Sequence, residues 1–526
     1  MTRRSLRTLS LAVISAVLVS ASDLRADDDE RPVDAVAFAA RLGREDAGRA
    51  EALLRFYASR GYRPAWTRGD RLSGQGEALV RVLRDADAEG LPSARYGNPA
   101  LDDAVAADAG TIDLRLTDAF LRYAADVAQG RLDPAAVNPY WAQRPHAADA
   151  AALLREAVDS GDVEKTLGAL LPRQAEYAAL REALERYRGI AEHGGWPTTL
   201  VARPALRGRR AGDVAVLRAR LLAEGDLSAT VPASRADLFD AAVASALKRF
   251  EARHGLKADG ILDKATVEAL NVPVEGRIRQ IELNLERWRW LAPALGDRFV
   301  LVNIAGFELH AFDGGRDVLR MRVVTGNAAR TPTPVFGRPM THVVFRPYWD
   351  VPTSIVEDEI MPAVRRDRGY LRRMNMVLVR GDGGTQLRQR PGPGNALGLV
   401  KFLLPNPFGV YLHDTPERPL FAQARRDRSH GCVRVERPFD LARFVLAGAP
   451  EWTPARIRSA MAAGDERHVP LPEPLPVFIT YLTVWTDADG VTRFFPDVYE
   501  HDAAQEKLLQ QTPARAANEA RFTRAE

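Results

Sequence analysis

The chain contains one cysteine, Cys432, and the residues around it are of the types that make a thiol reactive. It lies in the stretch Ser429-His430-Gly431-Cys432-Val433-Arg434. A neighbouring imidazole and guanidinium favour thiolate over thiol. Gly431 leaves room for a substrate carbonyl, and a backbone N–H beside the sulfur could stabilise an oxyanion. A lone thiol is more often a small buried hydrophobe, but these neighbours predict a nucleophile.

A cysteine nucleophile needs a base, and His413, nineteen residues upstream, is the best candidate. It ends the apolar run 409–412, which has strand character. The backbone carbonyl or the carboxylate of Asp414 could hold its other ring nitrogen. His430 is the alternative base, and we expect it to act as an oxyanion donor or local orienter. A buried core histidine is the alternative for His413. A zinc site including Cys432 is disfavoured because no fourth ligand lies at a usual spacing.

The first residues predict export. Residues 1–7 carry three arginines, and 9–21 form an apolar run too short for a comfortable membrane span. We therefore expect a signal peptide over residues 1–26, with an uncleaved inner-membrane anchor as the alternative. An exported chain with one thiol cannot form an internal disulfide, which favours a catalytic role for Cys432.

The amino-acid composition limits the classes of protein to which the chain could belong. The chain is 46% hydrophobic and 27% charged, with a net charge of +4. These values are typical of a soluble protein, and 526 residues predict two to four domains. The basic excess is small and widely spread, which argues against nucleic-acid binding. An anionic partner rich in carboxylates, such as the cell wall, remains compatible.

The elements that must position the thiol fall into three regions. Apolar spacing predicts helices through residues 32–188 and three short helices in 212–271. From residue 298 the spacing of apolar residues becomes that of β-strands. A predicted helical insertion at about 354–373 interrupts these strands. We therefore predict an α+β multidomain protein. The expected divisions are a helical scaffold domain at 27–207 completed by a linking helix at 277–297, a small domain at 208–276, a mostly β catalytic domain at 298–500 with a lid insertion at about 352–400, and a tail at 501–526 that is a frayed helix or disordered.

Two stretches resemble known families. In the small domain, Leu217-Arg218, Phe250, His254-Gly255-Leu256, Asp259-Gly260 and Thr266 through Leu270-Asn271 resemble the peptidoglycan-binding domain of exported wall enzymes. His413 together with the stretch 429–434 resembles the signature of L,D-transpeptidases, the cysteine enzymes of peptidoglycan crosslinking. Further motifs resemble the long Gram-negative type, which carries a helical scaffold and a lid: Pro347-Tyr348-Trp349-Asp350-Val351-Pro352, Asn395-Ala396-Leu397-Gly398 and Tyr411-Leu412-His413-Asp414-Thr415-Pro416.

The transpeptidase resemblance implies roles for individual residues. Cys432 would be the nucleophile, His413 the base, and the carbonyl of Asp414 the group that orients it. His430 and Gly431 would complete the catalytic set. The residues expected to bind substrate are Arg434, Ser429, Tyr411, Trp349 and Asn395. One common subtype has asparagine at the position of Arg434. No cofactor and no metal are implied.

The same resemblance implies the reaction. The thiolate would attack residue three of a tetrapeptide stem, release the terminal D-alanine and pass the acyl group to a second stem, giving a 3-3 crosslink. We expect a periplasmic monomer that meets donor and acceptor stems and possible partner proteins of wall synthesis, and that is a target of carbapenems. Alternatives are an L,D-carboxypeptidase or hydrolase, a transferase attaching a protein or D-amino acid to peptidoglycan, and a non-catalytic wall-binding scaffold.

Overall fold

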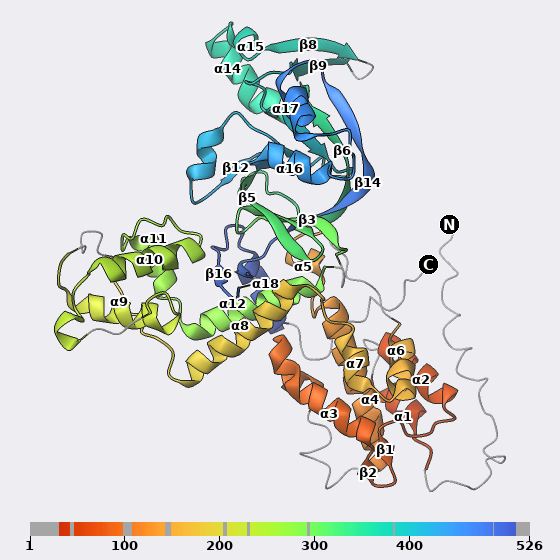
Figure 1. Ribbon diagram of the computed structural model, residues 1–526. Helices are drawn as coiled ribbons and strands as arrows, with labels where there is room; N and C mark the ends of the chain where they lie inside the picture. The colour runs from red at the N-terminus through yellow and green to blue at the C-terminus, as the bar shows by residue number, and fades with distance from the viewer. Residues whose placement is uncertain are drawn as a thin grey trace, which may run out of the picture.

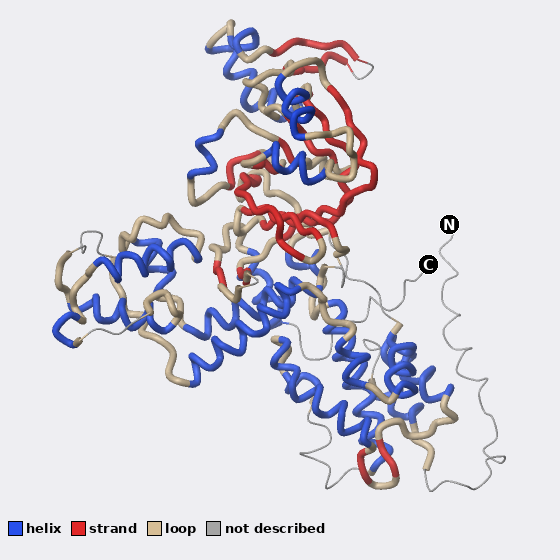
Figure 2. The backbone as a smooth tube through the Cα atoms, viewed as in Figure 1, coloured by secondary structure: helices blue, strands red, loops and turns tan. Residues whose placement is uncertain are grey.

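A computed structural model describes residues 31–42, 47–97, 108–142, 149–202, 208–228, 232–291, 295–381, 384–487 and 489–511. Three bodies meet at a central pair of helices (Figure 1). The β-rich body lies at the top of this view, a small helical body at the left and the N-terminal helices at the lower right. Figure 2 shows that most strands are confined to the upper body. The predicted α+β multidomain architecture is confirmed.

The N-terminal body is a helical bundle with one small hairpin. Its elements are α1 (Ala35–Arg41), α2 (Ala47–Ser59), β1 (Thr67–Arg68), β2 (Arg71–Leu72), α3 (Gly74–Arg84), 3₁₀ helices at Asp85–Glu89 and Ser93–Tyr96, α4 (Ala109–Gln129), α5 (Pro134–Val137), α6 (Ala150–Ser160) and α7 (Val163–Gly168). The buried carboxylate of Asp113 accepts hydrogen bonds from the backbone N–H groups of residues 65–67 and from the Tyr57 hydroxyl. Because a buried charge needs such partners, Asp113 fixes α4 against the chain before β1.

The small helical body consists of α9 (Gly212–Ala223), a 3₁₀ turn at Ala233–Arg235, α10 (Ala241–Arg253) and α11 (Lys264–Leu270). Asp240 and Asp263 cap the first turns of α10 and α11 by accepting backbone N–H bonds from Val243 and Thr266. The three helices enclose their own apolar core, centred on Leu217, Leu247 and Phe250. The three predicted helices of this region are therefore present.

Helices α8 (Ala175–Glu192) and α12 (Val274–Arg289) pack side by side at the centre of the molecule (Figure 1). Their buried side chains, including Leu184, Leu285 and Trp288, belong to the same apolar cluster as the strands of the upper body. The scaffold helices and the sheet therefore share one core, which couples the stability of the two bodies.

The upper body is built on a nine-stranded sheet with the order β12-β5-β13-β11-β10-β6-β14-β3-β4, and β4 also pairs with β5, which closes the sheet on itself. Its strands are β3 (Arg298–Asn303), β4 (Glu308–Asp313), β5 (Arg316–Gly326), β6 (Phe336–Phe345), β10 (Val400–Leu403), β11 (Leu412–His413), β12 (Asp427–Ser429), β13 (Val433–Val435) and β14 (Arg467–Thr480). A 3₁₀ helix at Arg418–Ala422, α16 (Pro438–Val445) and α17 (Pro454–Ala462) complete it, and a hairpin of β15 (Val484–Thr486) and β16 (Thr492–Phe494) follows β14.

The insertion between β6 and β10 is more than the predicted helical segment. It contains α13 (Thr353–Ile355), a π-helical turn at Val356–Ile360, α14 (Met361–Arg366) and α15 (Tyr370–Arg373). A three-stranded sheet joins them, with β9 (Gly384–Gln389) between β7 (Trp349–Asp350) and β8 (Met376–Gly381). Ile355, Ile360 and Leu387 form a small separate core. The insertion is thus a folded unit of its own.

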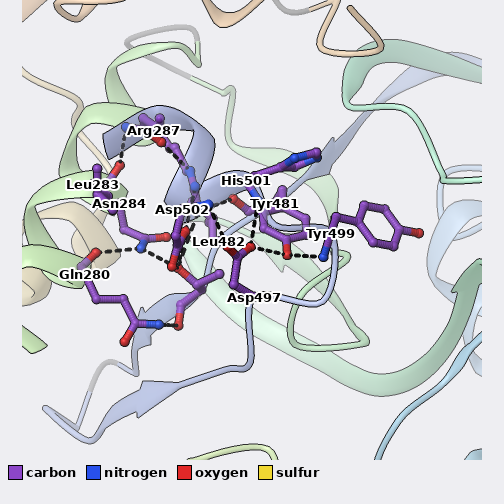
Figure 3. Close-up of polar contacts among 12 residues, drawn as sticks. Gln280, Leu283, Asn284, Arg287, Tyr481, Leu482, Asp497, Tyr499, His501 and Asp502 are labelled. Atoms are coloured by element: carbon purple, nitrogen blue, oxygen red, sulfur yellow. Dashed lines mark hydrogen bonds and ion pairs between the residues drawn. The ribbon is translucent and has the colours of Figure 1, made fainter. Parts of the chain in front are cut away.

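The end of the described chain is an ordered helix, α18 (His501–Gln511). It packs against α12, and Figure 3 shows Arg287 of α12 meeting Asp502 of α18. Of the two predicted alternatives, a frayed helix or a disordered tail, residues 501–511 form the helix, and it is ordered because His501, Gln505 and Leu509 are buried in this contact. Residues 512–526 and the predicted signal peptide, 1–26, lie outside the described residues. Within the described part of the chain, no helix is long and apolar enough to cross a membrane.

Candidate active site

Cys432 lies in a tight bend between β12 and β13. Gly431 adopts φ 107°, a conformation that favours glycine. The Ser429 hydroxyl donates to the Cys432 carbonyl at 2.5 Å and accepts the Gly431 N–H at 3.2 Å. Thr333 donates to the Gly431 carbonyl at 2.8 Å, which ties the bend to the loop after β5. The backbone that carries the sulfur is therefore held from both sides.

Strand pairing brings His413 to the same face of the sheet as Cys432. Parallel pairing of β11 with β13 sets Leu412 opposite Val433 and His413 opposite Arg434. The Val433 N–H donates to the Tyr411 carbonyl at 3.1 Å, which extends this register to Tyr411. Because side chains alternate along a strand, Tyr411, His413, Cys432 and Arg434 share one face. Residues distant in the sequence are thereby assembled around the thiol.

The imidazole of His413 is oriented by its neighbour. Its Nδ1 lies 2.5 Å from the carbonyl oxygen of Asp414, and an Nδ1–H donated there leaves Nε2 as the proton acceptor. Asp414 is fixed in turn, because its carboxylate accepts the Leu399 N–H at 2.9 Å. Gly398 leaves the space for this carboxylate, since a Cβ there would lie 2.4 Å from it.

Burial keeps both reacting groups uncharged at rest. It lowers the pKa of His413 to about 3, with the positive charge of Arg434 acting in the same direction. Burial also raises the pKa of the Cys432 thiol, against which hydrogen bonds from Tyr411 and the charges of Lys401 and Arg434 act. The resting site therefore holds a thiol and a neutral imidazole, which can accept a proton.

The other residues predicted to act at the site occupy different positions. His430 points to the insertion, where its Nε2 lies 2.6 Å from Glu359 Oε1. Arg434 forms an ion pair with Glu417. Ser429 is buried and holds the bend, as described above.

The remaining predicted substrate residues are Tyr411, Trp349 and Asn395. The Tyr411 ring is half-buried beside the thiol, 5.6 Å from the His413 ring. Trp349 is half-buried in β7 and packs on the core of the insertion. Asn395 is 1% exposed, and its amide donates to the carbonyls of residues 347 and 390. Because Asn395 is buried and backbone carbonyls already accept its amide hydrogen bonds, it fits a positioning role and not the predicted direct contact with substrate.

Two residues near the thiol had not been predicted. Lys401 of β10 stands opposite His413 in the sheet, and its Nζ lies 3.9 Å from the centre of the Tyr411 ring. Its sequence signal is a lone charge between the apolar residues Val400 and Phe402. Glu359, the partner of His430, carries no sequence signal, since the contact depends on how the insertion folds back.

A large cavity of about 1500 Å³ lies elsewhere, between the small helical body and the sheet. Residues of α11, α12 and β5 line it, and none of the predicted site residues does. Among the described residues no cluster of three or more histidine, cysteine, aspartate or glutamate side chains could hold a metal ion. The candidate chemistry therefore centres on the thiol and the imidazole.

Comparison with known families matches three parts of the chain. Residues 51–184 match a scaffold domain, residues 210–270 a family described as "Putative peptidoglycan binding domain", and residues 297–457 an L,D-transpeptidase catalytic domain. A Haemophilus influenzae protein named "Putative L,D-transpeptidase" is 31% identical over 220 residues, which are 39% of this chain and 44% of that protein. The chain thus spans less than half the length of this relative.

Solved structures of L,D-transpeptidases also align with the chain. Those from Xylanimonas cellulosilytica and Stackebrandtia nassauensis are 15% and 14% identical to it. Each alignment covers 53% of this chain and 98% or 97% of the other chain, with TM-scores of 0.16 and 0.23.

Proposed function

Because the chain carries the catalytic domain of the L,D-transpeptidase family over residues 297–457, we propose that it is a cysteine acyltransferase that forms 3-3 crosslinks in peptidoglycan. The supporting observation is that strand register sets His413 on the face of Cys432 while the Asp414 carbonyl fixes the imidazole tautomer. The substrate class follows from the catalytic domain and the neighbouring peptidoglycan-binding domain. We place the reaction in the periplasm, where such stems are exposed.

In the acylation step, His413 Nε2 takes the thiol proton and the Cys432 sulfur bonds to the carbonyl carbon of residue three of a tetrapeptide stem. The amide bond to the terminal D-alanine then breaks. The proton on His413 passes to the leaving amine, so free D-alanine and a thioester result. The imidazole is neutral before each cycle because burial depresses its pKa.

The oxyanion formed on attack needs a donor. Of the N–H groups of residues 431 and 432 in the bend, that of Gly431 is already donated to Ser429. Within the described residues no hydrogen bond is made by the Cys432 N–H. We therefore assign the oxyanion to the Cys432 N–H, and give Gly431 the conformational role of shaping the bend.

In the second step, a side-chain amine of an acceptor stem attacks the thioester. His413 removes a proton from the amine and returns one to the departing sulfur, which restores the resting thiol. Water competes for the same thioester, so the ratio of crosslinking to hydrolysis depends on solvent exclusion. The insertion that contacts His430 through Glu359 is placed to act as the lid.

The test uses the exported chain with a disaccharide-tetrapeptide. We expect wild type to give muropeptide dimers and an acyl-enzyme mass adduct at Cys432, and Cys432→Ala to give neither. His413→Ala should lose at least about 100-fold in rate, because general base catalysis contributes that much. The matched control is His193→Ala, an exposed histidine after α8, which should behave as wild type.

The alternatives are distinguished in the same assay. Tripeptide without dimer would indicate an L,D-carboxypeptidase. A stem in which an added D-amino acid replaces the terminal D-alanine, or a muropeptide joined to a lysine of an added protein, would indicate a different acceptor. Wall binding with no adduct at Cys432 would contradict the enzymatic proposal and favour a wall-binding scaffold.

A further inference from the structure

One lysine stands on the catalytic face of the sheet. In β10, Val400 and Phe402 are fully buried in the core, whereas Lys401 alternates with them and points to the opposite face. Antiparallel pairing sets Lys401 opposite His413. Because Tyr411 precedes His413 by two residues, the lysine is its diagonal neighbour, and Nζ reaches to 3.9 Å from the Tyr411 ring centre. The register that continues the parallel pairing of β11 with β13 sets Tyr411 in turn opposite Cys432.

The ammonium group has no ion-pair partner among the described residues. The acidic groups whose fields reach it are Glu466 and Asp350. Each is already engaged, Glu466 with His468 at 3.3 Å and Asp350 with Arg388 at 3.1 Å. Arg434, the other cation near the sulfur, is neutralised by Glu417. Lys401 therefore supplies a positive charge that forms no ion pair with any described side chain.

Burial opposes this charge, since it lowers the pKa of Lys401, whereas ionisation of Cys432 is the strongest influence that raises it. The interaction is reciprocal, because Lys401 also lowers the pKa of the Cys432 thiol. A half-buried lysine is costly to keep unless a negative charge appears beside it. In this site, the group that becomes negative is the sulfur.

We propose that Lys401 is the counter-ion of the Cys432 thiolate, a charge that the sheet holds ready for the moment at which His413 removes the thiol proton. The titratable and charged groups around it are His413 on β11, Tyr411 before that strand, Arg434 on β13, Cys432 before that strand, Asp350 on β7 and Glu466 before β14. The role deepens the proposed function and rests on it for its catalytic meaning. The effect of Lys401 on the pKa of the Cys432 thiol does not depend on that function.

The alternative is that Lys401 only packs. Its methylene stem and its cation–π contact would then support Tyr411 without acting on the sulfur. Lys401→Met keeps an unbranched side chain of similar length and removes the charge, and Lys401→Arg keeps the charge. Lys257→Met removes an exposed lysine from the small helical body and serves as the control.

The single cysteine makes the test direct, because a thiol reagent can alkylate only Cys432. The rate of iodoacetamide alkylation of the full chain is followed by intact mass from about pH 5 to 10. Removing a positive charge disfavours the thiolate, so Lys401→Met should raise the midpoint by about one pH unit. Lys401→Arg should largely restore it, and Lys257→Met should match wild type.

An unchanged midpoint in a folded Lys401→Met variant would overturn the proposal. In crosslinking assays at neutral pH, we expect the variant to lower kcat with KM little changed. A raised KM with an unmoved alkylation midpoint would instead make Lys401 a substrate contact, and would also overturn it. If wild type formed no crosslinks while the midpoint still shifted, the proposed function would fail and the counter-ion role would stand.

Discussion

The orientation of the His413 imidazole depends on the space that Gly398 leaves for Asp414. The Asp414 carbonyl fixes the ring, while the Asp414 carboxylate occupies the place where a side chain at residue 398 would stand. Gly398 also has φ 63°, in the left-handed region. A residue that touches neither the thiol nor the imidazole therefore controls the geometry between them.

We expect Gly398→Ala to lower the crosslinking rate by about 100-fold, because a displacement of the base by about 1 Å has that effect. The new Cβ would lie 2.4 Å from the Asp414 carboxylate and force it to move. Alkylation of Cys432 should persist, which shows that the thiol is still accessible. Gly394→Ala is the control, since nothing lies within 4 Å of its added Cβ. Equal rates for the two variants would contradict this account of Asp414.

At the same scale, sequence reasoning found the residues whose chemistry is local. Cys432 stood out as the only thiol, and His413 as a histidine at the end of an apolar strand beside a carbonyl. Lys401 did not stand out, because a lone charge in an alternating strand is most simply a solvated one. Its proximity to the thiol comes from pairing with β11 and could not be counted along the chain.

At the scale of elements, the insertion reaches the Cys432 bend by an exposed contact. The side chains of Glu359 and His430 are 54% and 44% exposed. Such a pair contributes at most about 1 kcal/mol. The proposed lid could therefore be released at little cost, as exchange of substrate requires.

Glu359→Ala should speed amide hydrogen exchange in residues 353–373 by up to about fivefold, the factor that corresponds to 1 kcal/mol. The same variant should shift products from dimer towards tripeptide, because water reaches the thioester more often. Glu357→Ala, on the same exposed turn, should change neither quantity. A product ratio that stays constant while exchange rises would separate lid closure from water exclusion.

The elements themselves were predicted unevenly. Long helices and buried strands such as β3 could be predicted from the pattern of apolar residues, because those residues face a core. The sheet of the insertion was missed because its edge strand β8 exposes Leu378 by 67%, so apolar spacing does not report burial there. Strand β13 has only three residues and depends on its neighbours on both sides.

At the scale of the whole molecule, a polar junction links α12, the segment after β14 and α18 (Figure 3). Arg287 of α12 is 1% exposed and lies 2.6 Å from Asp502 of α18. Thr483, which follows β14, donates to Asp502 at 2.8 Å, and Asn284 donates to Thr483 at the same distance. Burial raises the pKa of Asp502 despite the guanidinium, which marks this as a pair that is costly to bury.

A pair of this kind is strongly destabilising when one partner is removed, because the other stays buried and uncompensated. We therefore expect Asp502→Ala to lower the free energy of unfolding by about 3 kcal/mol. The matched control is Glu506→Ala, one turn further along α18, whose ion pair with Arg279 is partly exposed and should contribute about 1 kcal/mol or less. Urea unfolding followed by tryptophan fluorescence can compare them, since Trp288 and Trp485 pack together on α12 and the hairpin.

Because α12 shares its core with the sheet, loosening this junction should also separate the unfolding of the scaffold helices from that of the catalytic sheet. Asp502→Ala should then unfold in two resolved transitions, with the helical signal in circular dichroism lost mainly in the first and tryptophan fluorescence changing in both. In wild type and Glu506→Ala the two probes should coincide. Coincident probes in Asp502→Ala, or equal midpoints for the two variants, would mean that the apolar core alone holds the bodies together. The Arg287–Asp502 pair would then specify only how α18 docks.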